Sequence, residues 1–207
     1  MYSMADLDLM NHKQLFVNQV REIAELFGYE TRNKYQILDA NMRPVVFAAE
    51  QGKGLFGFVA RQYLGHWRTF DVHFLNPGRE ILLVAHHPFR WFFQRIEVRD
   101  GAGKFIGAIQ KKFSFFVKKF DVEDSLGRVI LQVESPLVKF WTFAFMRQGR
   151  KVAVVQKKWS GLFNELLTDK DVFLIEYTDP ALGLVERTLV LASSIFIDLL
   201  YFERKAN

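Results

Sequence analysis

Cysteine is absent from the 207-residue chain, which excludes disulfide bonds, thiolate catalysis, thiolate zinc sites and S-palmitoylation. Long hydrophobic runs are also scarce. The longest, from Leu189 to Phe202, is too short to span about 30 Å of hydrocarbon as a helix, and Asp198 interrupts it. The N-terminus lacks a basic segment followed by an apolar one, so no signal peptide is visible. These absences predict a cytoplasmic chain without a transmembrane span.

Enzyme signatures are missing as well. Gly101, Gly103 and Gly107 have the wrong spacing for a dinucleotide-binding loop, and we place them in a hairpin turn. His86 and His87 are adjacent on a predicted strand, so their side chains point to opposite faces and do not chelate one ion together. No Gly-x-Ser-x-Gly nucleophile elbow is present. We therefore predict that the chain is not an enzyme and has no catalytic residues.

Phenylalanine, by contrast, is abundant, with 22 residues, and aromatic side chains suit the half-buried surface of a β-sheet. Short alternating runs broken by turn residues predict about twelve strands, at 29–39, 44–50, 55–63, 68–75, 80–86, 91–99, 104–112, 114–123, 128–135, 140–147, 151–159 and 171–178. Turns such as 100–104 and 124–128 supply the positive-φ positions of tight hairpins. Closure would remove the exposed edges of so many strands. The sequence therefore predicts a mainly β fold, a closed antiparallel barrel of about twelve strands.

The last periodic segment, from about Leu184 to Phe202, is apolar on every side. Such a helix belongs in a core or a membrane, and this one is too short for the membrane. A barrel of about twelve strands has an interior wide enough to need filling. We therefore predict a hydrophobic C-terminal core helix inside the barrel, contributing Ile195, Phe196, Ile197, Asp198, Leu199, Leu200, Tyr201 and Phe202.

An N-terminal amphipathic helix is predicted from about Asn11 to Phe27. Phe16, Val20, Ile23 and Phe27 recur at helical spacing, and Gly28 stands where a C-terminal cap belongs. A helix with this pattern docks on a sheet or lies on a membrane surface. Residues 1–12 are expected to form a flexible lead-in, and the chain 1–207 a single domain.

The formal net charge of +5 suits an acidic partner such as an anionic membrane or nucleic acid, although many proteins that bind neither are equally basic. Six lysines occur as three doublets beside aromatic residues: Lys111, Lys112, Lys118, Lys119, Lys157 and Lys158. Since strand ends converge at the rims of a barrel, we predict that these lysines form an anion-binding rim. Anionic phospholipid headgroups are the expected partner and nucleic-acid phosphates the competing one. Scattered, solvated lysines are the alternative without a function.

Ordered motifs between residues 13 and 203 resemble the phospholipid scramblase family. Residues 27–37, FGYETRNKYQI, resemble the family's FETNNKY-I signature, and residues 87–90, HPFR, its RP-R stretch. Residues 107–110, GAIQ, match its IG-V-Q. Residues 155–173 look like its K-W-G---E--TDADNF block, and residues 195–203, IFIDLLYFE, resemble its terminal FLIDFMFFE. The Pro-rich and Cys-rich regions of eukaryotic members are absent, which suggests a short bacterial-type member.

The resemblance implies the tubby-like fold and calcium-stimulated movement of phospholipids between leaflets, or association with phospholipid membranes. Calcium is the one cofactor that it implies. The corresponding block retains Asp169 and Asp171, but Val172 and Leu174 replace the family's Asn and Gly. A calcium loop needs glycine for its sharp turn. We therefore expect Asp169 and Asp171 to form a degenerate calcium site that binds the ion weakly or not at all.

The leading hypothesis is a scramblase-family protein that lies peripherally on the inner face of a phospholipid membrane. If the apolar helix fills the barrel, no spanning element remains to carry headgroups across the bilayer. A lipid-binding or membrane-tethering tubby-like module that does not scramble is therefore the first alternative. A barrel that binds nucleic acid or another protein through the same lysines is the second.

Overall fold

The computed structural model describes residues 4–20, 33–51, 69–90, 92–136, 141–158 and 172–202. Its helical elements are a short 3-10 helix, η1 (Met4–Asp6), and the α-helix α3 (Leu184–Tyr201). Its strands are β1 (Gln14–Val20), β2 (Lys34–Leu38), β3 (Pro44–Glu50), β4 (Phe70–Leu75), β5 (Ile81–His87), β6 (Arg95–Asp100), β7 (Phe105–Lys112), β8 (Val117–Asp124), β9 (Val129–Pro136), β10 (Thr142–Arg147), β11 (Arg150–Lys158) and β12 (Val172–Tyr177).

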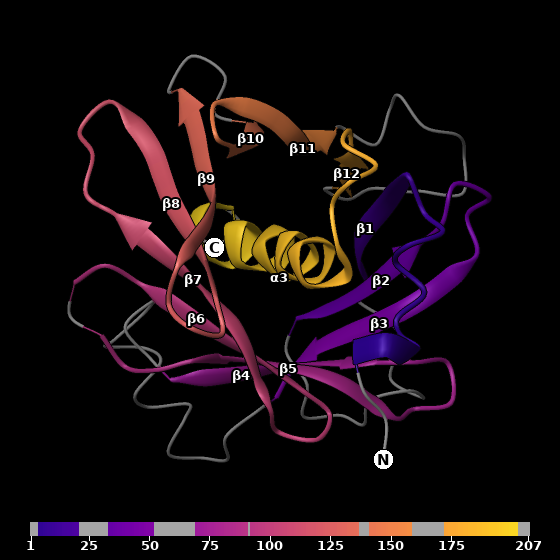
Figure 1. Cartoon of the computed structure of the whole chain (residues 1–207). Helices are drawn as coiled ribbons and strands as arrows, with labels where there is room; N and C mark the ends of the chain where they lie inside the picture. The colour runs from indigo at the N-terminus through magenta and orange to yellow at the C-terminus, as the bar shows by residue number, and fades with distance from the viewer. Residues whose placement is uncertain are drawn as a thin grey trace.

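These twelve strands form one closed barrel. Each strand pairs with the next along the chain in antiparallel register, and β1 also pairs with β12. Figure 1 shows α3 lying inside the ring of strands. The predicted closed barrel around a C-terminal helix is therefore confirmed. Eleven of the predicted strands correspond to β2 through β12, whereas the one predicted at 55–63 lies outside the described residues.

The prediction of an amphipathic helix at 11–27 is wrong for residues 14–20, which form β1. Phe16 and Val20 are four residues apart, and this spacing places two side chains on one side of a helix or of a strand alike. Phe16 packs against Leu38 and Leu174 on one face of β1, while Leu15 belongs to the main core on the other. Hydrogen-bonded pairing with β12 and β2 therefore makes residues 14–20 a strand and not a helix. Ile23 and Phe27 lie outside the described residues.

The start of the chain packs against the barrel, where the sequence suggested a flexible lead-in. Leu7 and Leu9 are 2% and 1% exposed and belong to the main hydrophobic core. Arg187 of α3 donates hydrogen bonds to the carbonyl oxygens of Leu9 and His12, at 3.1 and 2.7 Å. This segment is thus held by α3 as well as by apolar contacts.

Three hairpins use the same five-residue turn, which begins with Asp39, Asp100 or Asp124. Each aspartate Oδ1 accepts hydrogen bonds from the backbone N–H groups two and four residues later, at 2.8–3.0 Å. The third residue after each aspartate has a positive φ, and these residues are Met42, Gly103 and Gly127. The aspartate therefore replaces ladder hydrogen bonds that the turn cannot form.

The barrel interior is filled by α3. Every residue from Arg187 to Leu199 is buried, and the Ser193 and Ser194 hydroxyls donate 2.7 Å hydrogen bonds to the carbonyl oxygens of Leu189 and Leu191 within the helix. Asp198, 3% exposed, accepts a 2.8 Å hydrogen bond from the Tyr35 hydroxyl. Of the predicted core residues 195–202, only Leu200 and Tyr201 are partly exposed. A helix apolar on all sides is stable here because strands surround it.

Gly107 of β7 lies where the barrel wall packs against α3. A Cβ at this position would collide with the backbone carbonyl oxygen of Glu123 on β8 and lie 2.9 Å from Leu189 Cδ1. Gly107→Ala is therefore expected to lower the free energy of unfolding by about 2–3 kcal/mol, because a backbone carbonyl in a paired strand cannot move aside freely. Urea denaturation measures this change. An unfolding free energy equal to that of the parent would contradict this, because it would mean that β7 and β8 accommodate the added methyl group at no cost in stability.

Candidate functional site

The predicted lysine rim divides into two sets with different surroundings. Successive side chains of a strand point to opposite faces of the sheet, so the two members of each doublet diverge. Lys111, Lys118 and Lys157 approach the aromatic rings at the end of α3. Lys112 and Lys119 instead form ion pairs with residues of neighbouring strands.

The three inward lysines come from β7, β8 and β11 and converge on Tyr201 and Phe202. The Nζ atoms of Lys111 and Lys118 lie 5.6 and 4.3 Å from the Tyr201 ring centroid. Those of Lys118 and Lys157 lie 5.3 and 4.0 Å from the Phe202 centroid. We call this group, Lys111, Lys118 and Lys157 around Tyr201 and Phe202, the lysine mouth.

Packing of the strands explains why these lysines meet. Lys118 shares a strand face with Phe120, whose ring lies 5.9 Å from those of Phe196 and Tyr201. Lys111 lies four residues after Gly107 and therefore on the same face of β7, which contacts α3. Each of the three stands next to the last or first residue of its strand. The lysine mouth therefore occupies the end of the barrel at which α3 ends.

The helix end itself favours cations. The last turn of α3 contains no basic residue of its own, and the carbonyl groups at a helix C-terminus carry partial negative charge. Lysine ammonium groups from the strands lie beside this turn, where ring faces attract them further. Burial raises the pKa of the Tyr201 hydroxyl, so the ring stays neutral. Lys157 is only 8% exposed, whereas Lys111 and Lys118 are half-buried.

The outward lysines are balanced by carboxylates. Lys112 Nζ lies 3.2 Å from Asp121, and Lys119 Nζ lies 2.7 Å from Glu134. The structure therefore brings three of the six predicted lysines to one site and places Lys112 and Lys119 in exposed ion pairs. Lys158 is half-buried at the end of β11. The sequence did not indicate that Tyr201 and Phe202 form the aromatic floor of this site, although their position at the end of an apolar helix was the available signal.

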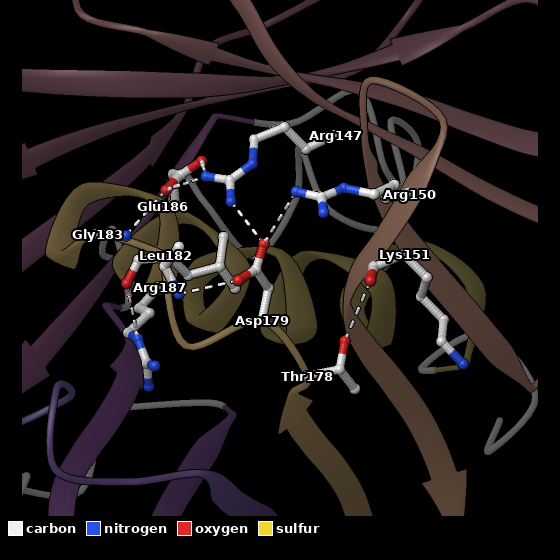
Figure 2. A network of polar contacts seen from close by, with 10 residues as sticks. Arg147, Arg150, Lys151, Thr178, Asp179, Leu182, Gly183, Glu186 and Arg187 are labelled. Carbon is white, nitrogen blue, oxygen red and sulfur yellow. Dashed lines mark hydrogen bonds and ion pairs between the residues drawn. The ribbon is translucent and has the colours of Figure 1, made fainter.

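The opposite end of α3 carries a closed network of charges. Figure 2 shows Arg147 of β10 between Asp179 and Glu186, with nitrogen–oxygen distances of 2.6 and 3.0 Å. Glu186 also accepts a 2.9 Å hydrogen bond from the N–H of Gly183, which caps the helix. The pKa of Asp179 is lowered by the backbone N–H of Ala181 and by Arg147. Here the cations are neutralised, so this network fastens α3 to the barrel wall.

A cavity of about 520 Å³ lies beside this network, between the start of β9 and the end of β10. The β9–β10 pairing stops at Gln132 and Met146, which leaves the strands apart at this point. Its lining combines apolar side chains of β9 with the paired Arg147 and Glu186. The lysine mouth brings three cationic side chains together, and we therefore take it as the candidate site for an anion.

The predicted calcium residues Asp169 and Asp171 lie outside the described residues. Val172 and Leu174 are described, and they belong to β12. Both pack with Phe16 and Leu38, so the position that should bear a glycine turn is an extended, buried strand. Within the described ranges, no group of three or more His, Asp or Glu side chains could hold a metal ion. Searched over the same ranges, the chain has no helix with the length and hydropathy needed to cross a membrane.

Comparison with known proteins gives a consistent result. A family model described as Scramblase matches residues 3–204. Phospholipid scramblase 1 of Mus musculus is 28% identical over 210 residues, which cover 94% of this chain and 62% of the mouse protein. Phospholipid scramblase 2 of Bos taurus is 28% identical, with coverage of 92% and 68%. Phospholipid scramblase family member 5 of Homo sapiens is 24% identical, with coverage of 97% and 76%.

The chain spans about three-fifths of the length of phospholipid scramblase 1 of Mus musculus and of Rattus norvegicus, at 62% and 61%. Among solved structures, a protein from Arabidopsis thaliana has a similar fold, with a TM-score of 0.53 and 11% identity. That match covers 93% of this chain and 95% of the plant protein. At this identity the likeness concerns the fold alone.

Proposed function

The chain belongs to the Scramblase family, and from this premise we propose that it binds the anionic phospholipids of a membrane surface through the lysine mouth. The observation that carries the proposal is the convergence of Lys111, Lys118 and Lys157 at one end of the barrel. Each lysine near an anionic bilayer adds roughly 1 kcal/mol of attraction. The membrane is approached from the cytosolic side, and nucleic acid is a weaker competing partner.

Vesicle co-sedimentation tests this proposal. Binding to phosphatidylcholine vesicles that contain phosphatidylserine is expected at low salt, with little binding to pure phosphatidylcholine. The bound fraction should fall steeply as ionic strength rises, because salt screens exposed charges beyond about 8–10 Å. An excess of duplex DNA should displace little of the bound protein. Efficient displacement would instead favour a nucleic-acid-binding barrel.

Matched double variants locate the site. Lys111→Gln with Lys118→Gln is expected to weaken vesicle binding about thirtyfold, while Lys112→Gln with Lys119→Gln should change it less than about twofold. Both variants remove two charges from the same two strands, but the second pair points away from Tyr201 and Phe202 and lies in ion pairs with Asp121 and Glu134. Lys111→Arg with Lys118→Arg should retain binding. Equal losses in the two glutamine variants would show that net charge alone, and not the lysine mouth, determines affinity.

Calcium is proposed to be dispensable for this binding. Support comes from Val172 and Leu174, which replace the family's Asn and Gly and lie within β12. The vesicle experiment should therefore give the same result with calcium and with a chelator. A strict requirement for calcium that vanishes on changing Asp169 and Asp171 to Asn would contradict this.

Transbilayer movement of phospholipids is the second candidate function, and the names of the relatives favour it. A flip assay with fluorescent lipid in vesicles tests it directly. The barrel interior is occupied by α3, so movement of headgroups would require a path other than the interior. Membrane binding without lipid exchange would leave a binding or tethering module as the function.

A further inference from the structure

Six phenylalanines are exposed on two connections of the barrel. Phe89, Phe92 and Phe93 lie between β5 and β6, and Phe113, Phe115 and Phe116 lie between β7 and β8. Their exposed fractions run from 43% for Phe89 to 80% for Phe116. Together they include every exposed aromatic side chain of the described residues. Exposure on this scale is unfavourable for an isolated domain and marks an interaction surface.

The two connections form a single patch. Phe93 and Phe113 meet edge to face with ring centroids 6.3 Å apart, and Phe113 meets Phe115 in the same way at 4.7 Å. Gln110 at the end of β7 donates a 2.9 Å hydrogen bond to the carbonyl oxygen of Phe93. We call these six residues the phenylalanine patch. Side chains distant in sequence are therefore held together at one rim.

This patch borders the lysine mouth. Lys111 and Lys118 lie in the strands that the 113–116 connection joins, so both features belong to the same end of the barrel. Residues 88–94 and 110–119 contain five cationic side chains and no acidic one. The nearby carboxylates of Asp121 and Glu134 are paired with Lys112 and Lys119. Apolar rings beside cationic side chains match the boundary between the acyl chains and the anionic headgroups of a bilayer.

The backbone of the patch is also unusual. Phe93 has a φ of 52°, a left-handed conformation that bulky side chains rarely adopt. Its side chain is nevertheless 47% exposed, so the strained conformation does not serve to bury the ring. Strained residues of this kind concentrate at binding sites.

We propose that the phenylalanine patch inserts into the interfacial layer of a phospholipid membrane and so docks the barrel with its lysine mouth facing the headgroups. This inference rests on the proposed membrane binding and adds the orientation and an apolar contribution to it. The rings enter the boundary below the phosphates, while the lysines remain at the level of the phosphates. Long-range attraction by the lysines precedes insertion, so binding still falls as ionic strength rises.

The absence of cysteine allows a clean test. Phe116→Cys and Leu126→Cys each introduce one site for an environment-sensitive NBD label. Leu126 is a matched control, because it is 74% exposed and lies in the turn at the other end of β8. On addition of phosphatidylserine-containing vesicles, the label at 116 should shift to the blue and brighten severalfold, while the label at 126 should not change. In parallel, Phe92→Ser with Phe115→Ser and Phe116→Ser should reduce vesicle binding at least about tenfold, and Leu126→Ser should not.

The outcomes separate the two proposals. If the protein co-sediments with vesicles while the label at 116 remains in water, insertion is overturned and the electrostatic proposal stands. The same holds if the triple serine variant binds and melts like the parent. Binding to neutral vesicles in high salt with the label at 116 in an apolar environment supports insertion and overturns the electrostatic proposal. No co-sedimentation overturns both. A change of the label at 116 without vesicles, accompanied by a doubling of mass, makes the patch a contact between two copies of this chain and overturns insertion.

Discussion

Ile197→Asp is expected to unfold the barrel or to lower its free energy of unfolding by about 4–5 kcal/mol or more. Ile197 is 1% exposed in the part of α3 that fills the core. The substitution removes the apolar contacts and buries a carboxylate with no designed partner, and each of these is among the largest single effects known. Urea denaturation and thermal melting, followed by circular dichroism, measure the loss.

The neighbouring residue shows why position matters. Asp198 is also buried, but the Tyr35 hydroxyl donates a hydrogen bond to it at 2.8 Å. A carboxylate is therefore tolerated at 198 because the barrel wall provides a donor there. Ile197→Val is the matched control and should lower stability by only about 1 kcal/mol. An Ile197→Asp variant that melts like the parent and loses only membrane binding would contradict a core position for α3.

Arg187→Met should lower the free energy of unfolding by about 3 kcal/mol or more. Arg187 is 4% exposed and donates hydrogen bonds to the carbonyl oxygens of Leu182, Leu9 and His12, at 3.1, 3.1 and 2.7 Å. Methionine retains much of the volume but removes these three hydrogen bonds, and the loss of charged donors to buried carbonyl groups is costly. Arg187→Lys should rescue only part of the loss, because a single ammonium does not reproduce the planar guanidinium fork.

Amide hydrogen exchange tests whether the lower stability of the Arg187→Met variant comes from release of residues 7–12. Amide protons of residues 7–12 should exchange faster in the Arg187→Met variant, because Arg187 joins this segment to α3. Arg150→Ala is the control, since its guanidinium is 78% exposed and 3.9 Å from Asp179, and it should change stability by less than about 1 kcal/mol. Unchanged exchange at 7–12 would show that other contacts hold the segment.

The sequence predicts that the two lysines of each doublet face opposite sides of the sheet, but it does not predict which of them faces α3. Alternation along a strand requires the two members of a doublet to face opposite sides. Which member faces α3 depends on register, and register depends on pairing with neighbouring strands. Lys111 and Lys118 are on paired strands, but Lys157 lies on β11, with β9 and β10 between β11 and β8. These lysines meet because the end of α3 lies between them.

By itself, the sequence determined the closed barrel, the hairpins and the apolar helix that fills it, because alternation, turn residues and an all-round apolar segment are local patterns. Only the tertiary structure decided three further features. Residues 14–20 form a strand. The four-residue spacing of their apolar side chains suits a helix and a strand equally, and pairing with β12 determines that the strand forms. The lysine mouth and the phenylalanine patch each unite segments distant in sequence, and such contacts arise only when the barrel closes and brings strand ends and their connections together at one rim.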